Sequence, residues 1–328
     1  MSSHHSSETA ADLAAVAALL EITEELGVSP LLDRAEPFTL DDLADAGGMT
    51  EDGATGLVEA LCASGLVERA GDPRKFVSCP DLADRRYEAG YLSWSLNANR
   101  PFIEHAPEFF RDPVGAAEKY QRNGRRVAVS SRWVGSMGFY PAAFSTIVES
   151  RPRRITDLGA GAGALVINVL RTLPASSGVV LDMSASACEE ATRAAARVGV
   201  ADRFQVVNRK IESLVDDPTP VDGADLVHAG FVMHDVSADP ETLDAVLRSC
   251  RTAMAPGGRL VVTDAIPYAA APRERKFSAL FTYLHATFMA VRLPTEAQWL
   301  EAFHTAGFAD VTCTEHRMPG ARMFVATV

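Results

Sequence analysis

A glycine-rich turn between two acidic residues is the strongest chemical signal in the 328-residue chain. Gly159, Gly161 and Gly163 follow a short apolar stretch that predicts a buried strand, and a helical pattern begins directly after them. Glycines at such positions allow a tight turn and a close approach of the backbone to a ligand. Asp157 comes two residues before the first glycine, and Asp182 ends the next predicted strand. We therefore predict the nucleotide-binding corner of an open α/β sheet.

The chemistry of this corner favours S-adenosylmethionine (SAM) over a dinucleotide. The spacing is G-x-G-x-G, whereas nicotinamide dinucleotide sites use G-x-G-x-x-G. A carboxylate at Asp157 would repel a pyrophosphate but attract the ammonium group of SAM. Asp182 stands near the distance at which an acid binds a ribose diol. A nicotinamide-dependent dehydrogenase is the runner-up hypothesis for this corner.

Several histidines follow at positions where a methyl acceptor could be activated. Open α/β sheets bind ligands beyond the carboxyl ends of their strands. The strand predicted over residues 224–228 ends in His228, and His234 and Asp235 follow it. His285 lies among aromatic residues on a helix predicted near residues 275–291, where a lone histidine is usually a packing residue. We expect His228 to line the SAM pocket and His234 to act in catalysis.

The elements that must position these residues alternate between strand and helix. Strands are predicted at residues 155–158, 179–182, 204–207, 224–228 and 258–264. Residues 311–315 and 323–328 follow as an antiparallel pair. Parallel strands with helical crossovers predict an α/β fold, with the Rossmann-like sheet of class I methyltransferases.

The first 90 residues predict a mostly helical module with a hairpin. Strands at residues 66–69 and 75–78 flank the turn A-G-D-P-R, and three helices precede them, which makes a winged helix. The helix predicted over residues 50–64 contains three acidic residues and no Lys or Arg. A DNA-recognition helix needs donors to phosphates and base edges. We therefore expect a dimerisation and lid module rather than a transcriptional regulator, the third hypothesis.

Composition and charge exclude several classes of partner. The formal net charge is −12, and the first 98 residues, with 18 acidic and 6 basic side chains, carry all of it. Such a surface repels nucleic acid and anionic lipid. No apolar run reaches the roughly 18 residues that span a bilayer, and no signal peptide is evident. Five scattered cysteines without a C-x-x-C favour reduced thiols and a cytoplasmic location. His4 and His5 stand in a Ser-rich leader that we expect to be disordered.

Three motifs resemble the O-methyltransferase family that carries an N-terminal winged-helix dimerisation domain. They are D-L-G-A-G-A-G, V-M-H-D and R-T-A-M-A-P-G-G-R-L-V-V-T-D, and the resemblance covers most of the chain. It implies a homodimer in which His234, the histidine of the H-D pair, is the general base that deprotonates a phenol. Metal-free O-methylation of a phenolic or polyketide hydroxyl is our alternative hypothesis.

A second set of motifs is similar to 2-oxo acid C-methyltransferases of peptide natural-product pathways, of the phenylpyruvate type. These motifs are Y-Q-R-N-G, S-S-R-W, F-V-M-H-D and Y-L-H-A-T-F-M-A-V-R-L-P-T-E-A-Q-W. The similarity implies a non-haem iron, or another metal, held by His234 and His285, with Arg132 and Asp235 near the substrate. A metal that chelates a 2-oxo acid would acidify the adjacent C–H and stabilise the enolate that attacks the methyl group. Our main hypothesis is therefore SAM-dependent methylation of the β-carbon of a phenylpyruvate-, indolepyruvate- or branched-chain-like 2-oxo acid.

The expected domains are a dimerisation domain (1–90), linker helices that line the substrate pocket (91–150) and the SAM-binding catalytic domain (151–328). Arg132 would hold a substrate carboxylate, because a guanidinium suits it geometrically. Trp94 and Met233 are the other expected substrate contacts. Lys210 stands where the family usually has an acid near the adenine, which leaves the adenine contacts open.

Overall fold

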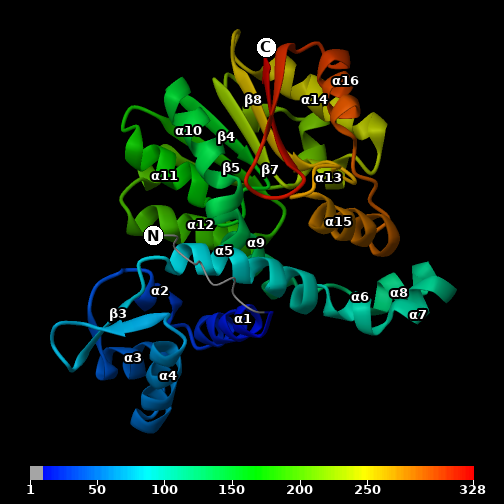
Figure 1. The fold of residues 1–328 in the computed structure, drawn as a ribbon. Helices are drawn as coiled ribbons and strands as arrows, with labels where there is room; N and C mark the ends of the chain where they lie inside the picture. The colour runs from blue at the N-terminus through cyan, green and yellow to red at the C-terminus, as the bar shows by residue number, and fades with distance from the viewer. Residues whose placement is uncertain (1–9) are drawn as a thin grey trace, which may run out of the picture. The chain divides into compact units, whose positions relative to one another are not determined.

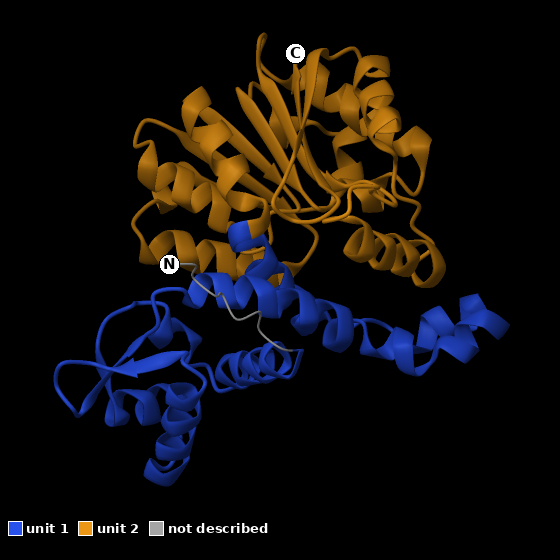
Figure 2. Ribbon diagram, in the orientation of Figure 1, with its two compact units in different colours: residues 1–137 blue, residues 138–328 orange. Residues whose placement is uncertain are grey.

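The computed structural model describes residues 10–328, so the leader with His4 and His5 lies outside the described residues. The chain divides into two compact units, one ending at Met137 and the other spanning Gly138–Val328 (Figure 2). The segment 91–150, expected to link two domains, is therefore divided between both units.

The first unit is mostly helical and contains a small antiparallel sheet (Figure 1). Its strands β1 (Phe38–Thr39), β2 (Val67–Arg69) and β3 (Lys75–Ser78) pair in the order β1-β3-β2. The hairpin of β2 and β3 lies where the sequence predicts it. Its helices are α1 (Ala10–Glu25), α2 (Ser29–Leu32), α3 (Leu40–Gly47), α4 (Glu51–Ala63), α5 (Leu82–Leu92), η1 (Ser93–Ala98), α6 (Arg100–Glu104), α7 (Ala106–Arg111), α8 (Pro113–Lys119) and α9 (Gly124–Gly138).

Local sequence signals explain where two of these helices begin. Thr39 starts α3 through a reciprocal cap, because its hydroxyl accepts the Asp42 N–H at 3.1 Å and its own N–H donates to the Asp42 carboxylate at 2.8 Å. Thr50 starts α4 by accepting the Gly53 N–H at 3.2 Å.

The second unit is built on a seven-stranded mixed sheet (Figure 1). Its strands are β4 (Arg154–Leu158), β5 (Ser177–Asp182), β6 (Phe204–Asn208), β7 (Leu226–Gly230), β8 (Arg259–Ala265), β9 (Ala309–Glu315) and β10 (Ala321–Thr327). They pair in the order β6-β5-β4-β7-β8-β10-β9; β4 to β8 run parallel, and β10 is antiparallel to both of its neighbours. The predicted α/β fold with a terminal antiparallel pair is confirmed. The strand order reverses between β4 and β7, which is where such sheets bind ligands.

Helices cover both faces of this sheet. Successive strand residues point to opposite faces, so Leu226 packs in the core beneath α10 and α11, whereas Val227 packs in the core beneath α14 and α16. The helices of the unit are α10 (Tyr140–Ser150), α11 (Ala164–Thr172), α12 (Ala185–Arg197), η2 (Ala201–Arg203), η3 (Ile211–Val215), η4 (Thr219–Val221), α13 (Met233–Val236), α14 (Pro240–Ala253), α15 (Arg275–Phe288) and α16 (Glu296–Thr305). Among residues 10–328, no helix is long and apolar enough to cross a membrane.

Candidate active site

The three glycines form the turn between β4 and α11, and each has a positive φ. A Cβ at Gly159 would lie 2.5 Å from Cγ1 of Val232, and one at Gly163 would lie 2.8 Å from Cζ of Phe204. A Cβ at Gly161 would meet nothing within 4 Å. Gly159 and Gly163 therefore serve packing as well as backbone conformation, whereas Gly161 is required for its backbone conformation and has open space beside its Cα.

Asp182, at the carboxyl end of β5, holds the glycine turn in place. One of its oxygens, Oδ2, accepts the Gly161 N–H at 2.8 Å, and Oδ1 accepts the Ser184 N–H at the same distance. A carboxylate fixed in this way keeps lone pairs for further donors. The geometry fits an acid that binds the two hydroxyls of a ribose.

The residues at the end of β6 and directly after it lie where the family usually has an acid near the adenine, the position that Lys210 occupies here. Asn208 donates to the backbone carbonyl of Asp182 at 2.9 Å. Arg209 is bound to Asp217 at 2.6 Å and to the backbone of its own loop. Lys210 is exposed. Asn208 and Arg209 thus serve to order this loop.

Asp157 and His228 form a buried pair at the point where the strand order reverses. They are register partners on β4 and β7, and the imidazole Nδ1–H of His228 donates to Oδ1 of Asp157 at 2.7 Å. Their exposed fractions are 4% and 1%. Within the described chain, Nε2 of His228 has no hydrogen-bond partner. Gly230 leaves space beside the ring, since a Cβ there would lie 3.1 Å from Cε1. A buried imidazole nitrogen without a partner, beside a carboxylate, fits the amino-acid end of SAM.

His234, at the start of α13, is held by Asp264 at the carboxyl end of β8. The Asp264 carboxylate accepts the His234 backbone N–H at 2.9 Å and its ring Nδ1–H at 2.6 Å. It also accepts the Ala265 N–H at 2.8 Å and is fully buried. Asp235, which the resemblance places near the substrate, is largely exposed and lies 3.7 Å from Nε2 of His234. Asp264 is therefore the residue that fixes the tautomer and orientation of the ring.

Phe231 precedes His234 in a strained conformation, with a φ of 55°. A bulky residue rarely adopts a positive φ, so its surroundings must hold it there. Its N–H donates to the Thr263 carbonyl at 2.8 Å, and its ring lies 4.5 Å from that of Phe139 and 6.2 Å from that of Phe281. The positive φ of Phe231 bends the chain between the end of β7 and the start of α13, the helix that carries His234.

The structure brings His285 of α15 to His234. Their ring centroids lie 5.1 Å apart at a nearly perpendicular angle, and His285 also stacks on Phe281 at 4.1 Å. The Nδ1–H of His285 donates to the Phe281 carbonyl at 2.7 Å. Imidazoles that bind metals usually donate their other ring nitrogen in this way. Nevertheless, among residues 10–328, no three His, Cys, Asp or Glu side chains are grouped to hold a metal ion.

The remaining predicted site residues have the following surroundings. Arg132 of α9 belongs to the first unit, where its guanidinium is bound to Glu24 at 2.6 Å. Trp94, in the same unit, is buried. Met233 is adjacent to His234 and packs in the core of the second unit.

The sequence pattern does not single out two residues of this site, Asp264 and Phe231. The signal for Asp264 was present, because it ends a predicted parallel strand as Asp182 does. Asp235 is nearer in sequence to His234, so the local pattern favours Asp235 instead. Nothing in the sequence marks the positive φ of Phe231, because it depends on packing between distant segments.

Comparisons with known proteins show the family of this chain. The sequence model of the O-methyltransferase domain family matches residues 143–309. The aclacinomycin 10-hydroxylase RdmB of Streptomyces purpurascens is 33% identical over 170 residues, which is 52% of this chain and only 43% of that protein. The 3-hydroxy-5-methyl-1-naphthoate 3-O-methyltransferase of Streptomyces sahachiroi is 29% identical over 83% of this chain and 80% of its own.

A solved structure shows the same fold along the whole chain. Human N-acetylserotonin methyltransferase, solved with SAM, is 19% identical and superposes with a TM-score of 0.58 over 100% of this chain and 99% of its own. The family match covers just over half of the 328 residues. The chain therefore belongs to the O-methyltransferase domain family of SAM-dependent methyltransferases.

Proposed function

We propose that this protein transfers the methyl group of SAM to a phenolic or polyketide hydroxyl in natural-product biosynthesis, with His234 as general base. The observation that carries this proposal is the buried pair of Asp264 and His234. Because the Asp264 carboxylate accepts a hydrogen bond from Nδ1–H at 2.6 Å, Nε2 is the ring nitrogen that accepts a proton from the substrate.

The chemical step needs no group beyond the donor, the acceptor and this pair. As the acceptor hydroxyl loses its proton to Nε2 of His234, its oxygen forms a bond to the methyl carbon, and the bond from that carbon to sulfur breaks. The sulfonium becomes the neutral thioether of S-adenosylhomocysteine (SAH), and the proton leaves on the imidazole. The negative charge of Asp264 stabilises the imidazolium that forms.

The same proposal assigns SAM to the glycine corner. In this proposal, the Gly161 backbone and Asp182 bind the ribose of SAM. Asp157 and His228 bind its charged amino-acid end. Gly159 and Gly163 shape the turn around it. This placement is supported by the unpartnered Nε2 of His228 and by the open space at Gly161.

The names of the relatives support a hydroxyl acceptor. The naphthoate O-methyltransferase that aligns with 83% of this chain is named for a hydroxyl on an aromatic acid. RdmB, which is similar over about half of this chain, is named as a hydroxylase. We also propose a homodimer, which light scattering after gel filtration would test.

Carbon methylation of a 2-oxo acid is the second candidate, and the 5.1 Å between the rings of His234 and His285 favours it. In that case the two imidazoles would hold a divalent metal or iron, which would acidify the C–H next to the keto group. Asp235 would lie beside the metal-binding nitrogen of His234, and Arg132 would hold the carboxylate. The described side chains supply no third protein ligand for this metal.

One experiment separates the two candidates. The protein is incubated with methyl-labelled SAM and either 3-hydroxy-5-methyl-1-naphthoate and related phenols or phenylpyruvate and other 2-oxo acids, with EDTA or with added Fe²⁺. We expect methyl ethers in EDTA, and we expect His285→Gln to retain activity while His234→Gln loses it. Label found only on the carbon of a 2-oxo acid, only with metal, would overturn the proposal in favour of the second candidate.

A further inference from the structure

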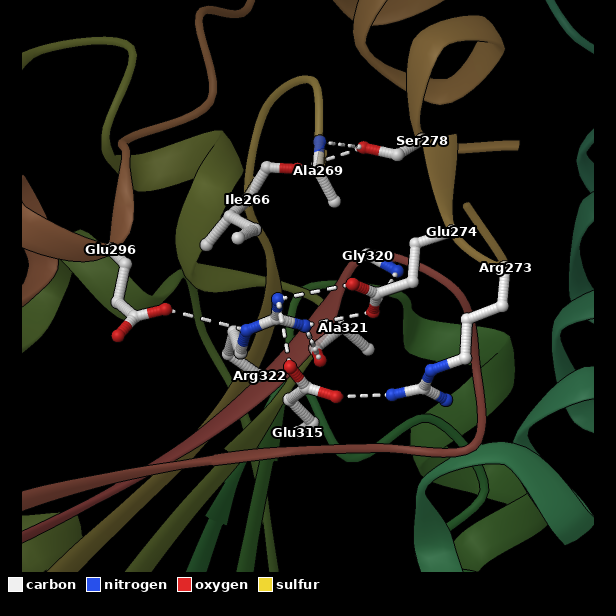
Figure 3. Close-up of polar contacts among 10 residues, drawn as sticks. All are labelled: Ile266, Ala269, Arg273, Glu274, Ser278, Glu296, Glu315, Gly320, Ala321 and Arg322. Atoms are coloured by element: carbon white, nitrogen blue, oxygen red, sulfur yellow. Dashed lines mark hydrogen bonds and ion pairs between the residues drawn. The ribbon is translucent and has the colours of Figure 1, made fainter. Parts of the chain in front are cut away.

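Helix α15, which carries Phe281 and His285, begins at a buried ion pair (Figure 3). Glu274, directly before the helix, is 1% exposed, and Arg322 of β10 is 7% exposed. The Arg322 guanidinium donates to both oxygens of Glu274, at 3.0 and 3.2 Å. These hydrogen bonds hold the pKa of Glu274 below its usual range. The pair is therefore ionised and geometrically fixed at neutral pH.

Arg322 is also close to two further carboxylates (Figure 3). Its Nε lies 3.4 Å from Glu296 at the start of α16, and its Nη2 lies 3.8 Å from Glu315 at the end of β9. Glu315 in turn is paired with Arg273. We call these five residues, Arg273, Glu274, Glu296, Glu315 and Arg322, the Arg322 cluster. The cluster joins the end of β9 and the start of β10 to the starts of α15 and α16.

The turn between β9 and β10 is bound to the first turns of α15. The Gly320 N–H donates to the Glu274 carboxylate at 3.1 Å. Gly320 has a φ of +81°, and a Cβ there would lie 3.1 Å from Cβ and Oγ of Ser278. The Ser278 hydroxyl accepts the Ala269 N–H at 2.9 Å, so the loop after β8 is attached to the same helix face (Figure 3). These contacts leave the start of α15 little freedom to shift.

The same turn reaches the other side of the candidate active site. The Met318 N–H donates to the carbonyl of Gly138 at 3.2 Å. The ring of the next residue, Phe139, packs against that of Phe231 at a tilted angle, with the centroids 4.5 Å apart, and the Phe231 ring lies 6.2 Å from that of Phe281. The turn is thus connected to both of the aromatic side chains that flank His234.

We propose that Glu274 and Arg322 are positioning residues, which fix α15 against β10 and thereby set Phe281 and His285 relative to His234. The helix rises about 1.5 Å per residue, so the eleven residues from Glu274 to His285 span about 16 Å. The pair therefore acts through the helix, without touching the substrate. A buried ion pair often adds no more stability than well-packed apolar side chains do, so its contribution here is orientation. The catalytic consequence rests on the proposed role of His234.

The test replaces the pair without leaving a lone buried charge. The double variant Glu274→Leu, Arg322→Met substitutes apolar side chains of similar length. Nuclear Overhauser effects (NOEs) between the ring protons of His234 and His285, whose centroids lie 5.1 Å apart, report their separation in the protein without any acceptor. We expect these NOEs to weaken at least about twofold, because the effect falls steeply with distance, while the thermal midpoint shifts by less than about 4 °C.

The matched control is the exposed pair of Arg248 and Asp244 on α14, 3.0 Å apart, changed to Met and Leu. It should leave the NOEs unchanged. A second variant, Arg322→Lys, keeps the charge but cannot bond both carboxylate oxygens, and should weaken the NOEs less. The Arg322→Lys variant also tests the proposal if the double variant does not fold.

In the activity arm, we expect kcat to fall at least about tenfold in the double variant, because Phe281, whose ring lies 6.2 Å from that of His234, shifts together with α15. SAH affinity should stay within about twofold, because only transition-state geometry is lost. Ring NOEs of unchanged intensity in both Arg322 variants would overturn the proposal. Weakened NOEs together with no methyl transfer to any hydroxyl, even in the unmodified protein, would support the positioning role and count against the proposed function.

Discussion

Asp264 and His234 are joined through both backbone and side chain. The two oxygens of one buried carboxylate accept the His234 backbone N–H at 2.9 Å and its ring Nδ1–H at 2.6 Å. The residue that selects the tautomer of the imidazole therefore also anchors the start of α13. In the proposed reaction, His234 meets the acceptor already oriented, and no reorganisation has to accompany proton transfer.

Asp264→Asn should lower kcat by about 100-fold or more, because an amide cannot stabilise the imidazolium and permits the wrong tautomer. SAH affinity, measured by calorimetry, should stay the same, because Asp264 faces His234 rather than the glycine corner. Asp235→Asn is the matched control, since its side chain is 64% exposed. An Asp264→Asn variant with the kcat of the unmodified protein would show that this carboxylate has no catalytic role.

His228→Leu should weaken SAH binding about tenfold or more, the cost of losing one buried polar contact. Binding of 5′-methylthioadenosine should not change, because this molecule lacks the amino-acid end that His228 is proposed to bind. His304→Leu, an exposed histidine on α16, is the control. Equal losses for both ligands would place His228 away from the amino-acid end.

The stability of the protein should depend on pH through His316. Burial, and to a lesser extent the charge of Arg322, lower the pKa of His316 from 6.5 to about 4. Between these values the unfolded chain binds a proton that the folded protein does not, so the free energy of unfolding falls as pH drops from about 6.5 to about 4. His316→Leu should reduce that slope in urea unfolding at pH 7, 6 and 5. Identical slopes in both proteins would contradict the assignment.

The Phe231→Gly variant should be more stable than the Phe231→Ala variant, although both remove the aromatic ring. The positive φ of 55° costs alanine about 1 kcal/mol or more, and glycine adopts it freely. Urea unfolding of Phe231→Gly and Phe231→Ala measures the difference. We expect both to lose activity, because the ring packs between Phe139 and Phe281. Equal stability of the two variants would mean that the backbone relaxes and stores no strain.

Local sequence patterns were sufficient to predict the strand, glycine turn and helix that form the proposed SAM-binding corner. The glycine turn, Asp157 and Asp182 lie within one strand–turn–helix–strand segment, so their spacing along the chain determines their arrangement in space. The pairing of Asp157 with His228 follows from two parallel strands in register. The approach of His285 to His234 came from a resemblance, because no short-range rule relates residues 51 positions apart.

Two other contacts, of His234 with Asp264 and of Glu274 with Arg322, could not be predicted from the sequence in the same way. Asp264 is 30 residues from His234, and the order of the strands in the sheet brings them together. Glu274 and Arg322 are 48 residues apart and meet only because β10 inserts beside β8. Such contacts depend on the order of the strands in the sheet. Without that order, a charged residue in the sequence is expected to be exposed to solvent.

The most direct test of the central claim is the single-turnover rate of methyl transfer from labelled SAM to a phenolic acceptor in EDTA. His234→Gln should reduce this rate by about 100-fold to 10,000-fold, the range for removal of a general base. It should leave SAH affinity unchanged. A His234→Gln protein that methylates the acceptor at nearly the unmodified rate would contradict the account.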